Sequence, residues 1–251
     1  MSKLKILVTG MCGRLGTVIG EKLNQDFELT SLDLTSKKGF KSYTASIACL
    51  EAIQPAFLSQ DVVIHLGADP RGEAPWTSIL ENNIIGTRNV FEAARIAGVK
   101  RVIFATTNHV VGYLYQQNNL YKSIFEGTLK DFNVKIPQIP NNSSNPDCLY
   151  AVSKLFGESL ASYYHDKFKM SFICIRFGGI EVPDRKVNDH PSKRAVWLSH
   201  TDLAQIIKLS INAPSSVGYE IIYGISNNTL KVHDLTSAKS SIGYHPVDDA
   251  G

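Results

Sequence analysis

Three glycines near the start of the chain constrain its fold most strongly. Gly10, Gly13 and Gly16 follow the apolar run at residues 4–8, in the sequence KILVTGMCGRLG, and apolar residues at helical spacing come next. This order predicts a short buried strand, a tight turn and a helix. Backbone N–H groups in such a turn can hold the pyrophosphate of a dinucleotide, which larger side chains would block. The alternative is a strand-to-helix turn that binds no ligand.

The second predicted strand, residues 28–32, is followed directly by Asp33. An acidic residue about 20 positions beyond such a glycine turn binds the ribose 2′-hydroxyl of NAD, and its charge repels the 2′-phosphate of NADP. Asp33 therefore favours NAD; the alternative is an aspartate that only starts a turn. The glycine spacing, G-x-x-G-x-x-G, differs from the best-known G-x-G-x-x-G fingerprint.

Composition argues against several other kinds of protein. The chain has 251 residues, of which 43% are hydrophobic and 20% charged, as expected for a soluble globular protein. Its net charge of +3 is too small to indicate nucleic acid or a membrane surface, and no apolar run approaches the ~20 residues of a membrane span. The four cysteines lack C-x-x-C spacing and the seven histidines lack a metal-binding cluster, so we expect no metal. Reduced cysteines and the lack of a signal peptide favour a cytoplasmic location.

Strand and helix patterns alternate along the chain, which predicts an α/β fold with a Rossmann-type, doubly wound parallel sheet. We expect Gly98 to end one helix as a C-cap and Ser199 with Asp202 to start another as a capping box. Strands are expected at 4–8, 28–32, 42–45, 61–67, 101–106, 171–176 and 219–223, and helices at 15–23, 75–97, 149–164 and 202–212.

Two segments interrupt this alternation. Residues 113–147 are polar and contain three prolines, and a loop of this length predicts some helix and a position over a site. Residues 183–194 are charged and bounded by proline. We therefore expect one Rossmann-type NAD-binding domain over residues 1–251, in which residues 177–200 and 225–251 contribute a small C-terminal substrate lobe.

A tyrosine and a lysine four residues apart, Tyr150 and Lys154, begin a predicted helix and share one of its faces. A tyrosine hydroxyl titrates near ~10, too high for a general base at neutral pH. A nearby ammonium and a cationic nicotinamide would both favour the phenolate. The same spacing recurs at Tyr163 and Lys167, which we interpret as a solvated helix end.

Polar side chains follow the strand predicted at residues 101–106. The carboxyl ends of parallel strands are where ligands bind, so Thr107, Asn108 and His109 are candidate substrate contacts. The Thr107 hydroxyl could orient a substrate oxygen towards Tyr150. The alternatives are ordinary turn residues and a structural histidine.

Several motifs occur in a fixed order over nearly the whole chain: TGMCGRLG, DVVIHLGA, ENNIIGT, ATTNHVVG and Y-x-x-x-K. Together they resemble the extended short-chain dehydrogenase/reductase superfamily, and within it the NAD-dependent epimerase/dehydratase family. NHVVG, VWLSHTDLAQ and DLTSAKSSIGYHP are similar to the uronate dehydrogenase branch, which has relatives acting as NAD-dependent glucose-6-phosphate dehydrogenases.

The resemblance implies a role for each matching position. Tyr150 would be the general base, Lys154 would hold the nicotinamide ribose and tune Tyr150, and Thr107 would stand for the usual serine or threonine. NAD would take a hydride from the anomeric carbon of a cyclic sugar, giving a lactone. The implied cofactor-binding residues are Gly10, Gly13, Arg14, Leu15, Gly16, Asp33, Ser46, Ile47, Leu66, Gly67, Ala68, Tyr150 and Lys154, together with Asn83, which would sit in the helix behind the site.

The substrate side departs from the uronate dehydrogenase pattern. Pro70 and Gly179 replace two substrate-binding serines, and Ser192 aligns with the arginine that grips the uronate carboxylate. A different anionic or neutral sugar is therefore expected, and residues 113–147 look like an insertion beside the site. The predicted substrate-binding residues are Arg71, Thr107, Asn108, His109, Gly179 and Arg194.

Three hypotheses about function follow. The preferred one is NAD-dependent oxidation of a sugar, sugar acid or sugar phosphate at the anomeric carbon. The second is a nucleotide-sugar epimerase or dehydratase, in which NAD is retained and recycled. The third is a non-catalytic NAD-binding regulator. The resemblance also implies a homo-oligomer assembled through helix packing.

Overall fold

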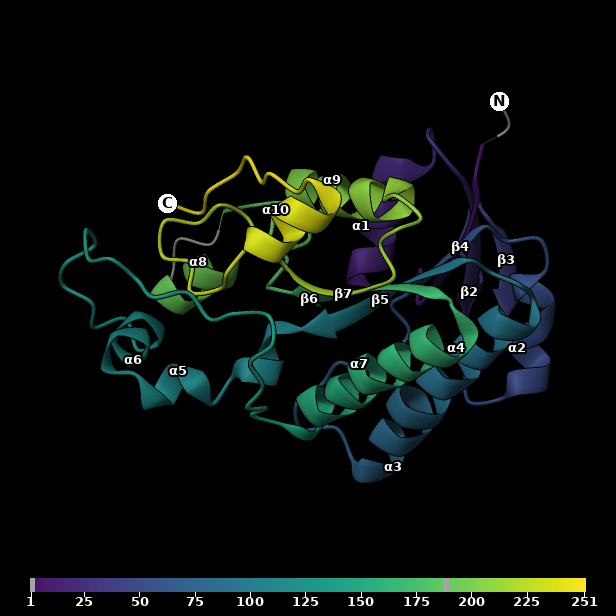
Figure 1. The fold of residues 1–251 in the computed structure, drawn as a ribbon, viewed down its shortest axis with the longest axis horizontal. Coiled ribbons are helices and arrows are strands. Elements are labelled where there is room, and N and C mark those ends of the chain that lie inside the picture. Colours follow the sequence, from purple (N-terminus) through teal and green to yellow (C-terminus); the bar gives the residue numbers. More distant parts are fainter. Residues whose placement is uncertain (1–2, 187–189) are drawn as a thin grey trace.

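The computed structural model describes residues 3–186 and 190–251, and within them seven strands form one parallel sheet. The strand order is β3-β2-β1-β4-β5-β6-β7, so the order reverses direction between β1 and β4 (Figure 1). Ligands of doubly wound sheets bind at this switch point. The strands are β1 (Lys5–Thr9), β2 (Glu28–Asp33), β3 (Lys41–Thr44), β4 (Val62–His65), β5 (Arg101–Thr107), β6 (Ser171–Phe177) and β7 (Tyr219–Gly224). The predicted Rossmann-type fold is confirmed.

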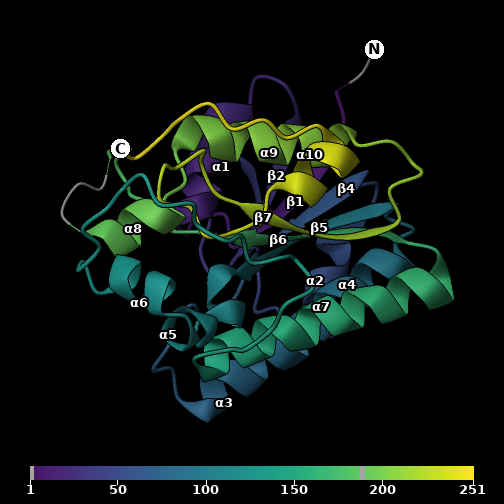
Figure 2. The same ribbon diagram turned by 60° about the vertical axis from the view of Figure 1, so that its left-hand side comes forward.

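Helices cover both faces of the sheet (Figure 1, Figure 2). Strand β5 shows why: Ile103 and Ala105 join the apolar core on one face, whereas Val102 and Phe104 join the core on the other. Strands that are apolar on both faces are typical of buried parallel sheets. One face carries α1 (Arg14–Leu23), α9 (His200–Asn212) and α10 (Thr236–Ile242); the other carries α2 (Leu50–Phe57), α4 (Gly86–Ile96) and α7 (Leu149–Phe168).

The helix predicted at residues 75–97 has a different middle from the one expected. It consists of α3 (Trp76–Ser78), a π-helical segment η1 (Ile79–Ile85) and α4. A π segment adds a residue per turn, so the 3.6-residue pattern does not reveal it, and such segments often occur at functional sites. Gly98 ends α4 at φ +73°, which confirms the predicted C-cap.

Two other helices differ from the sequence prediction, one as a whole and one at its N-terminal cap. Helix α2 was not predicted, because Pro55 lies inside it; its apolar face, with Ile53, is nevertheless buried. At α9, the Ser199 hydroxyl accepts the Asp202 N–H at 3.0 Å, as predicted. The Asp202 carboxylate does not complete the capping box. It accepts the Ser226 hydroxyl and the N–H groups of two C-terminal residues, and so ties the tail to α9.

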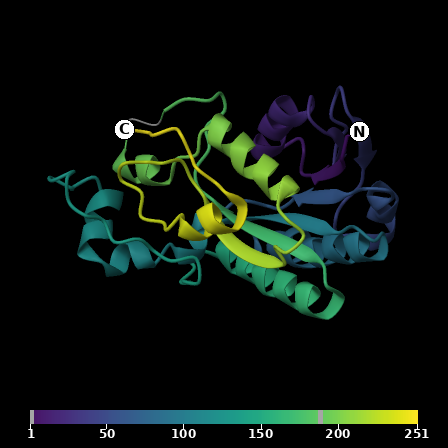
Figure 3. The ribbon, with the colours of Figure 1, turned by 45° about the horizontal axis from the view of Figure 1, so that its top comes forward.

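A small lobe stands beside the sheet, at the end of the molecule that holds the C-terminus (Figure 3). It contains α5 (Leu114–Gln117), α6 (Asn119–Phe125) and α8 (Pro191–Val196), so helix is present in the 113–147 segment as predicted. Of the segment predicted at 183–194, residues 187–189 lie outside the described residues. The lobe has its own apolar core, which includes Val110, Val111, Tyr115, Tyr121, Ile124, Ile139, Ala195, Leu230 and Val232.

No helix in the described part of the chain is both long and apolar enough to cross a membrane.

Candidate active site

A cleft of about 820 Å³ runs along the carboxyl ends of the central strands. Every predicted cofactor-binding residue except Asn83 lines it, and so do four predicted substrate residues, Thr107, Asn108, His109 and Gly179. Residues far apart in sequence therefore meet at one sheet edge. This edge is the position expected for a ligand in a doubly wound fold.

The glycine turn leaves room that side chains would fill. Gly10 has φ +72°, and a Cβ there would lie 2.7 Å from the Gly67 nitrogen. A Cβ on Gly16 would lie 2.5 Å from the Gly10 carbonyl oxygen. Helix α1 begins immediately after Gly13, with no side chain capping its N-terminus. Both features suit a phosphate group, so the residues present fit a dinucleotide.

Asp33 ends β2 beside this turn. One carboxylate oxygen accepts the Cys12 N–H at 2.7 Å and the other accepts the Leu34 N–H at 2.7 Å. The carboxylate thus fastens the glycine turn to β2 while lining the cleft. An acidic group in this place suits a ribose hydroxyl and opposes an added phosphate.

Tyr150 and Lys154 occupy the first turns of α7 and face the cleft. The Lys154 ammonium lies 5.6 Å from the centre of the Tyr150 ring and 4.9 Å from that of Phe104. Burial lowers the pKa of Lys154 to about 7, with Glu158 opposing the shift. Burial, assisted by Cys148, raises the pKa of Tyr150 above its ordinary value. In the protein without cofactor, desolvation therefore outweighs the effect of the ammonium that the sequence suggested.

We expect Lys154→Met to stabilise the protein without cofactor more at pH 6 than at pH 10. The pKa of Lys154 falls from 10.5 to about 7 on folding, so the folded state binds fewer protons between these values and stability rises with pH across that window. Below pH 7 the cost of burying the charge is fully present, on the order of 5 kcal/mol.

Urea unfolding at the two pH values measures this effect. Lys167→Met, at the exposed end of the same helix, is the control and should show no such difference. An equal effect of Lys154→Met at both pH values would contradict the interpretation.

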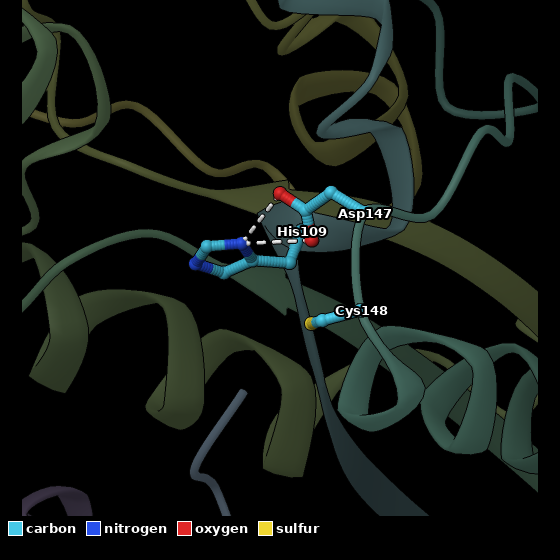
Figure 4. A group of neighbouring side chains, drawn as sticks. All are labelled: His109, Asp147 and Cys148. Atoms are coloured by element: carbon cyan, nitrogen blue, oxygen red, sulfur yellow. Dashed lines mark hydrogen bonds and ion pairs between the residues drawn. The ribbon is translucent and has the colours of Figure 1, made fainter. Parts of the chain in front are cut away.

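The substrate candidates follow β5 into the 3-10 helix η2 (Asn108–Val111). The Thr107 hydroxyl accepts the His109 N–H at 3.2 Å. The His109 Nδ1 lies 2.9 Å from an Asp147 oxygen, and its other ring nitrogen points away from Asp147 (Figure 4). The carboxylate accepts a hydrogen bond here, so Nδ1 carries the hydrogen. Cys148 is adjacent, and donor atoms of His109, Asp147 and Cys148 lie within 4.8 Å of one another.

Asn108 is held by contacts from the lobe. The Asn108 amide donates to the Tyr115 hydroxyl at 3.4 Å. The same hydroxyl lies 2.8 Å from the Nε2 of His233. Burial lowers the pKa of His233 to about 3, so this ring is neutral. Sequence reasoning missed Tyr115 and His233, because 118 positions separate them.

Comparison with known proteins shows the family of the chain. Residues 6–201 match the model of the NAD dependent epimerase/dehydratase family. The chain belongs to this family. The NAD-dependent glucose-6-phosphate dehydrogenase of Haloferax volcanii is 34% identical, over 98% of this chain and 94% of that protein. The L-arabinose 1-dehydrogenase (NAD(P)(+)) of the same organism is 33% identical, over 98% of this chain and 97% of that protein. A uronate dehydrogenase variant from Agrobacterium tumefaciens, solved in complex with NAD, has a TM-score of 0.80 and 30% identity, over 98% of this chain and 86% of that one.

Three residues predicted for the site of this epimerase/dehydratase family member do not reach the cleft. Asn83 is buried behind it, in the helical segment where the resemblance placed it, and bonds the backbone of Asp69 and the Ser153 hydroxyl, while its neighbour Asn82 lines the cleft. Arg71 turns outwards to pair with Asp69 at 2.6 Å.

The third residue is Arg194 of α8. Its guanidinium lies 3.5 Å from the position that a Cβ on the C-terminal Gly251 would take. Three positions at which the chain departs from the uronate dehydrogenase pattern do line cavities. Pro70 and Gly179 line the cleft, and Ser192 lines a second cavity beside it.

A buried ion pair fixes α7 against the sheet. Arg176 of β6 bonds both carboxylate oxygens of Glu158, at 2.9 and 2.8 Å, and the Thr106 hydroxyl donates to the same carboxylate. Both charged side chains are almost fully buried. Tyr150 and Lys154 lie on α7, and Thr107 ends β5. The ion pair between α7 and the sheet therefore sets the relative positions of these three residues. Sequence reasoning did not identify it.

A buried histidine supports the glycine loops from beneath the cleft. The Thr9 hydroxyl oxygen accepts the Gly67 N–H at 3.1 Å, so its hydrogen is free to reach the His65 Nδ1 at 2.7 Å. The other His65 nitrogen lies 3.2 Å from the Thr87 hydroxyl. Burial, with a smaller effect of Lys154, lowers the pKa of His65 well below its ordinary value, so the ring is neutral. A histidine inside the apolar run VVIHLG is the sequence signal for this residue.

Proposed function

We propose that the protein oxidises a sugar, sugar acid or sugar phosphate at its anomeric carbon, giving a lactone, with NAD as hydride acceptor and Tyr150 as general base. The observation that carries this proposal is the shared cleft of Tyr150, Lys154 and Thr107, which also contains the glycine turn and Asp33. The named sugar dehydrogenases among the relatives support the substrate class.

The cofactor and the substrate would divide the cleft between them. The glycine turn and the first residues of α1 would hold the pyrophosphate, and Asp33 a ribose hydroxyl. When bound, NAD supplies the hydride acceptor and a positive charge. The Thr107 hydroxyl would hold the oxygen on the anomeric carbon, with Asn108 and His109 contacting neighbouring hydroxyl groups.

Tyr150 would take the proton from the anomeric hydroxyl as the carbon loses its hydride. Its raised pKa makes it a weak base before the cofactor binds. Lys154, with a pKa of about 7, gains a proton readily at neutral pH, and its ammonium then favours the phenolate. The positive charge of a bound cofactor would favour the phenolate further.

We expect Asp33→Asn to lower the preference for NAD over NADP by about tenfold or more, measured as the ratio of kcat/KM for the two cofactors. The neutral amide no longer repels a 2′-phosphate, and a like-charge contact costs several kcal/mol. Asp166→Asn, on the exposed face of α7, should leave the ratio unchanged. An unaltered ratio in Asp33→Asn would remove Asp33 from the cofactor site.

A screen of hexuronates, aldoses and hexose phosphates for NADH absorbance tests the reaction class. Sugar-dependent NADH, formed in amounts that exceed the enzyme, supports the dehydrogenase. Tightly retained NAD with no net NADH would instead favour an epimerase or dehydratase. Failure of every sugar to reduce NAD⁺ would favour a regulator.

We also propose that the protein forms a homo-oligomer. Half-exposed apolar side chains, among them Ile85, Ile96 and Val152, lie on the adjoining elements η1, α4 and α7, and a second copy of the chain would cover them. Light scattering of the purified protein tests this, and a monomer at all concentrations would contradict it.

We further propose a substrate lobe within the single domain. It would comprise residues 177–200 and 225–251 together with α5 and α6.

A further inference from the structure

A second cavity, of about 640 Å³, opens beside the catalytic cleft. Asn108, His109 and Val196 line both spaces, so they share a wall at the substrate end of the cleft. The second cavity is built by η2, α5, α6, α8 and Asp147 just before α7. Its other lining residues in the described part of the chain are Gly112, Tyr115, Gln116, Lys122, Phe125, Glu126, Asp147, Ser192 and Lys193.

The charges around this cavity cancel. Two lysines, Lys122 and Lys193, face two carboxylates, those of Glu126 and Asp147, and histidine is counted as neutral. Lys122 lies 3.8 Å from Glu126, and Asp147 accepts a hydrogen bond from His109. Because the lining has no net charge, it offers no net attraction to a phosphate or carboxylate, so it favours an uncharged ligand.

The other groups in the lining suit a sugar ring. Tyr115 and Phe125 stack at 4.0 Å with their planes 8° apart, which gives the cavity a flat aromatic element. Gln116 and Ser192 add an amide and a hydroxyl. An apolar aromatic surface with a few convergent polar groups is the usual form of a small-ligand site, and it matches the C–H faces and hydroxyl groups of a pyranose.

We propose that the second cavity is a subsite for a further glycosyl unit, so that the substrate is a disaccharide or longer sugar with a free reducing end. This proposal rests on the proposed function. The reducing-end ring lies in the cleft with its anomeric carbon at Tyr150, and the next ring lies in the second cavity. The anomeric C–H gives a hydride to NAD⁺, the anomeric hydroxyl gives its proton to Tyr150, and the glycosidic bond is unchanged. Asn108 and His109, in the shared wall, lie beside the linkage.

The test compares kcat/KM for NADH formation from maltose, cellobiose and lactose with that from glucose and galactose. We expect at least one disaccharide to exceed its component monosaccharides by about tenfold or more. Gln116→Trp, which fills the second cavity, should lower the disaccharide-to-monosaccharide ratio by about tenfold. Gln117→Trp, on the same helix but lining neither cavity, should leave that ratio unchanged. Both glutamines are exposed, so neither substitution removes core packing.

Three results would overturn the proposal. Oxidation of monosaccharides with no gain for any disaccharide would remove the subsite and leave the proposed function intact. Preference for a hexose phosphate that Gln116→Trp abolishes would make the cavity a phosphate site. Absence of NADH from every sugar, phosphorylated or not, would overturn the subsite and the proposed function together.

Discussion

Replacing Tyr150 with phenylalanine is expected to lower kcat by 10²–10⁴-fold, the contribution of a positioned general base, while NAD affinity stays within about twofold. The substitution removes one hydroxyl oxygen and keeps the ring beside Lys154, so packing at the start of α7 is retained. NADH formation measures the rate, and fluorescence titration with NAD⁺ measures binding. Loss of rate with intact binding would assign the hydroxyl to proton transfer.

The chain supplies a matched control in Tyr163→Phe. Tyr163 and Lys167 repeat the spacing on the same helix, and the Lys167 ammonium donates to the Tyr163 hydroxyl at 2.7 Å. This pair is exposed at the far end of α7, as predicted from the sequence, and lines neither cavity. Tyr163→Phe should therefore retain full activity. A Tyr150→Phe enzyme with activity close to that of Tyr163→Phe would contradict the proposed mechanism.

Glu158→Gln is expected to destabilise the folded protein by about 3–5 kcal/mol, because the buried Arg176 charge loses its carboxylate partner. The amide oxygen can still accept hydrogen bonds, but the amide cannot neutralise the guanidinium, and its NH₂ group cannot accept the second guanidinium N–H. Urea unfolding followed by circular dichroism measures the change in the free energy of unfolding.

A surface ion pair provides the comparison for this prediction. Asp26 and Lys208 join the turn after α1 to α9 at 2.5 Å, and both side chains are more than 40% exposed. Asp26→Asn should cost less than about 1 kcal/mol, since water screens an exposed pair. A loss below about 1 kcal/mol for Glu158→Gln as well would show that the buried pair does not fix α7.

The sequence was most informative where a local rule decides the structure. The glycine turn, Asp33 and the residues after β5 were found because each follows a buried strand, and parallel strands end at one edge. Helix α2 escaped notice because Pro55 argues against a helix and only the sheet beneath it supplies the compensating burial. The π segment η1 was hidden for a related reason, since its apolar pattern departs from the helical period.

Side-chain direction was the part of the site that local pattern did not determine. Arg71 contacts Asp69 from outside the cleft and does not enter it. Arg194 turns towards the C-terminus. The partnerships of Arg176 with Glu158 and of Tyr115 with His233 join distant parts of the chain and leave no local signal. The second cavity likewise exists only once α5, α6 and α8 meet.

Oxidation at the anomeric carbon is tested most directly with a sugar labelled with ¹³C at that carbon. The enzyme, excess NAD⁺ and a sugar active in the screen are followed together by NMR and NADH absorbance. The proposed mechanism predicts that the anomeric signal is replaced by that of a lactone or its aldonate, with one NADH formed per sugar consumed. An unchanged oxidation level at the labelled carbon, with a change at another carbon and no net NADH, would contradict it.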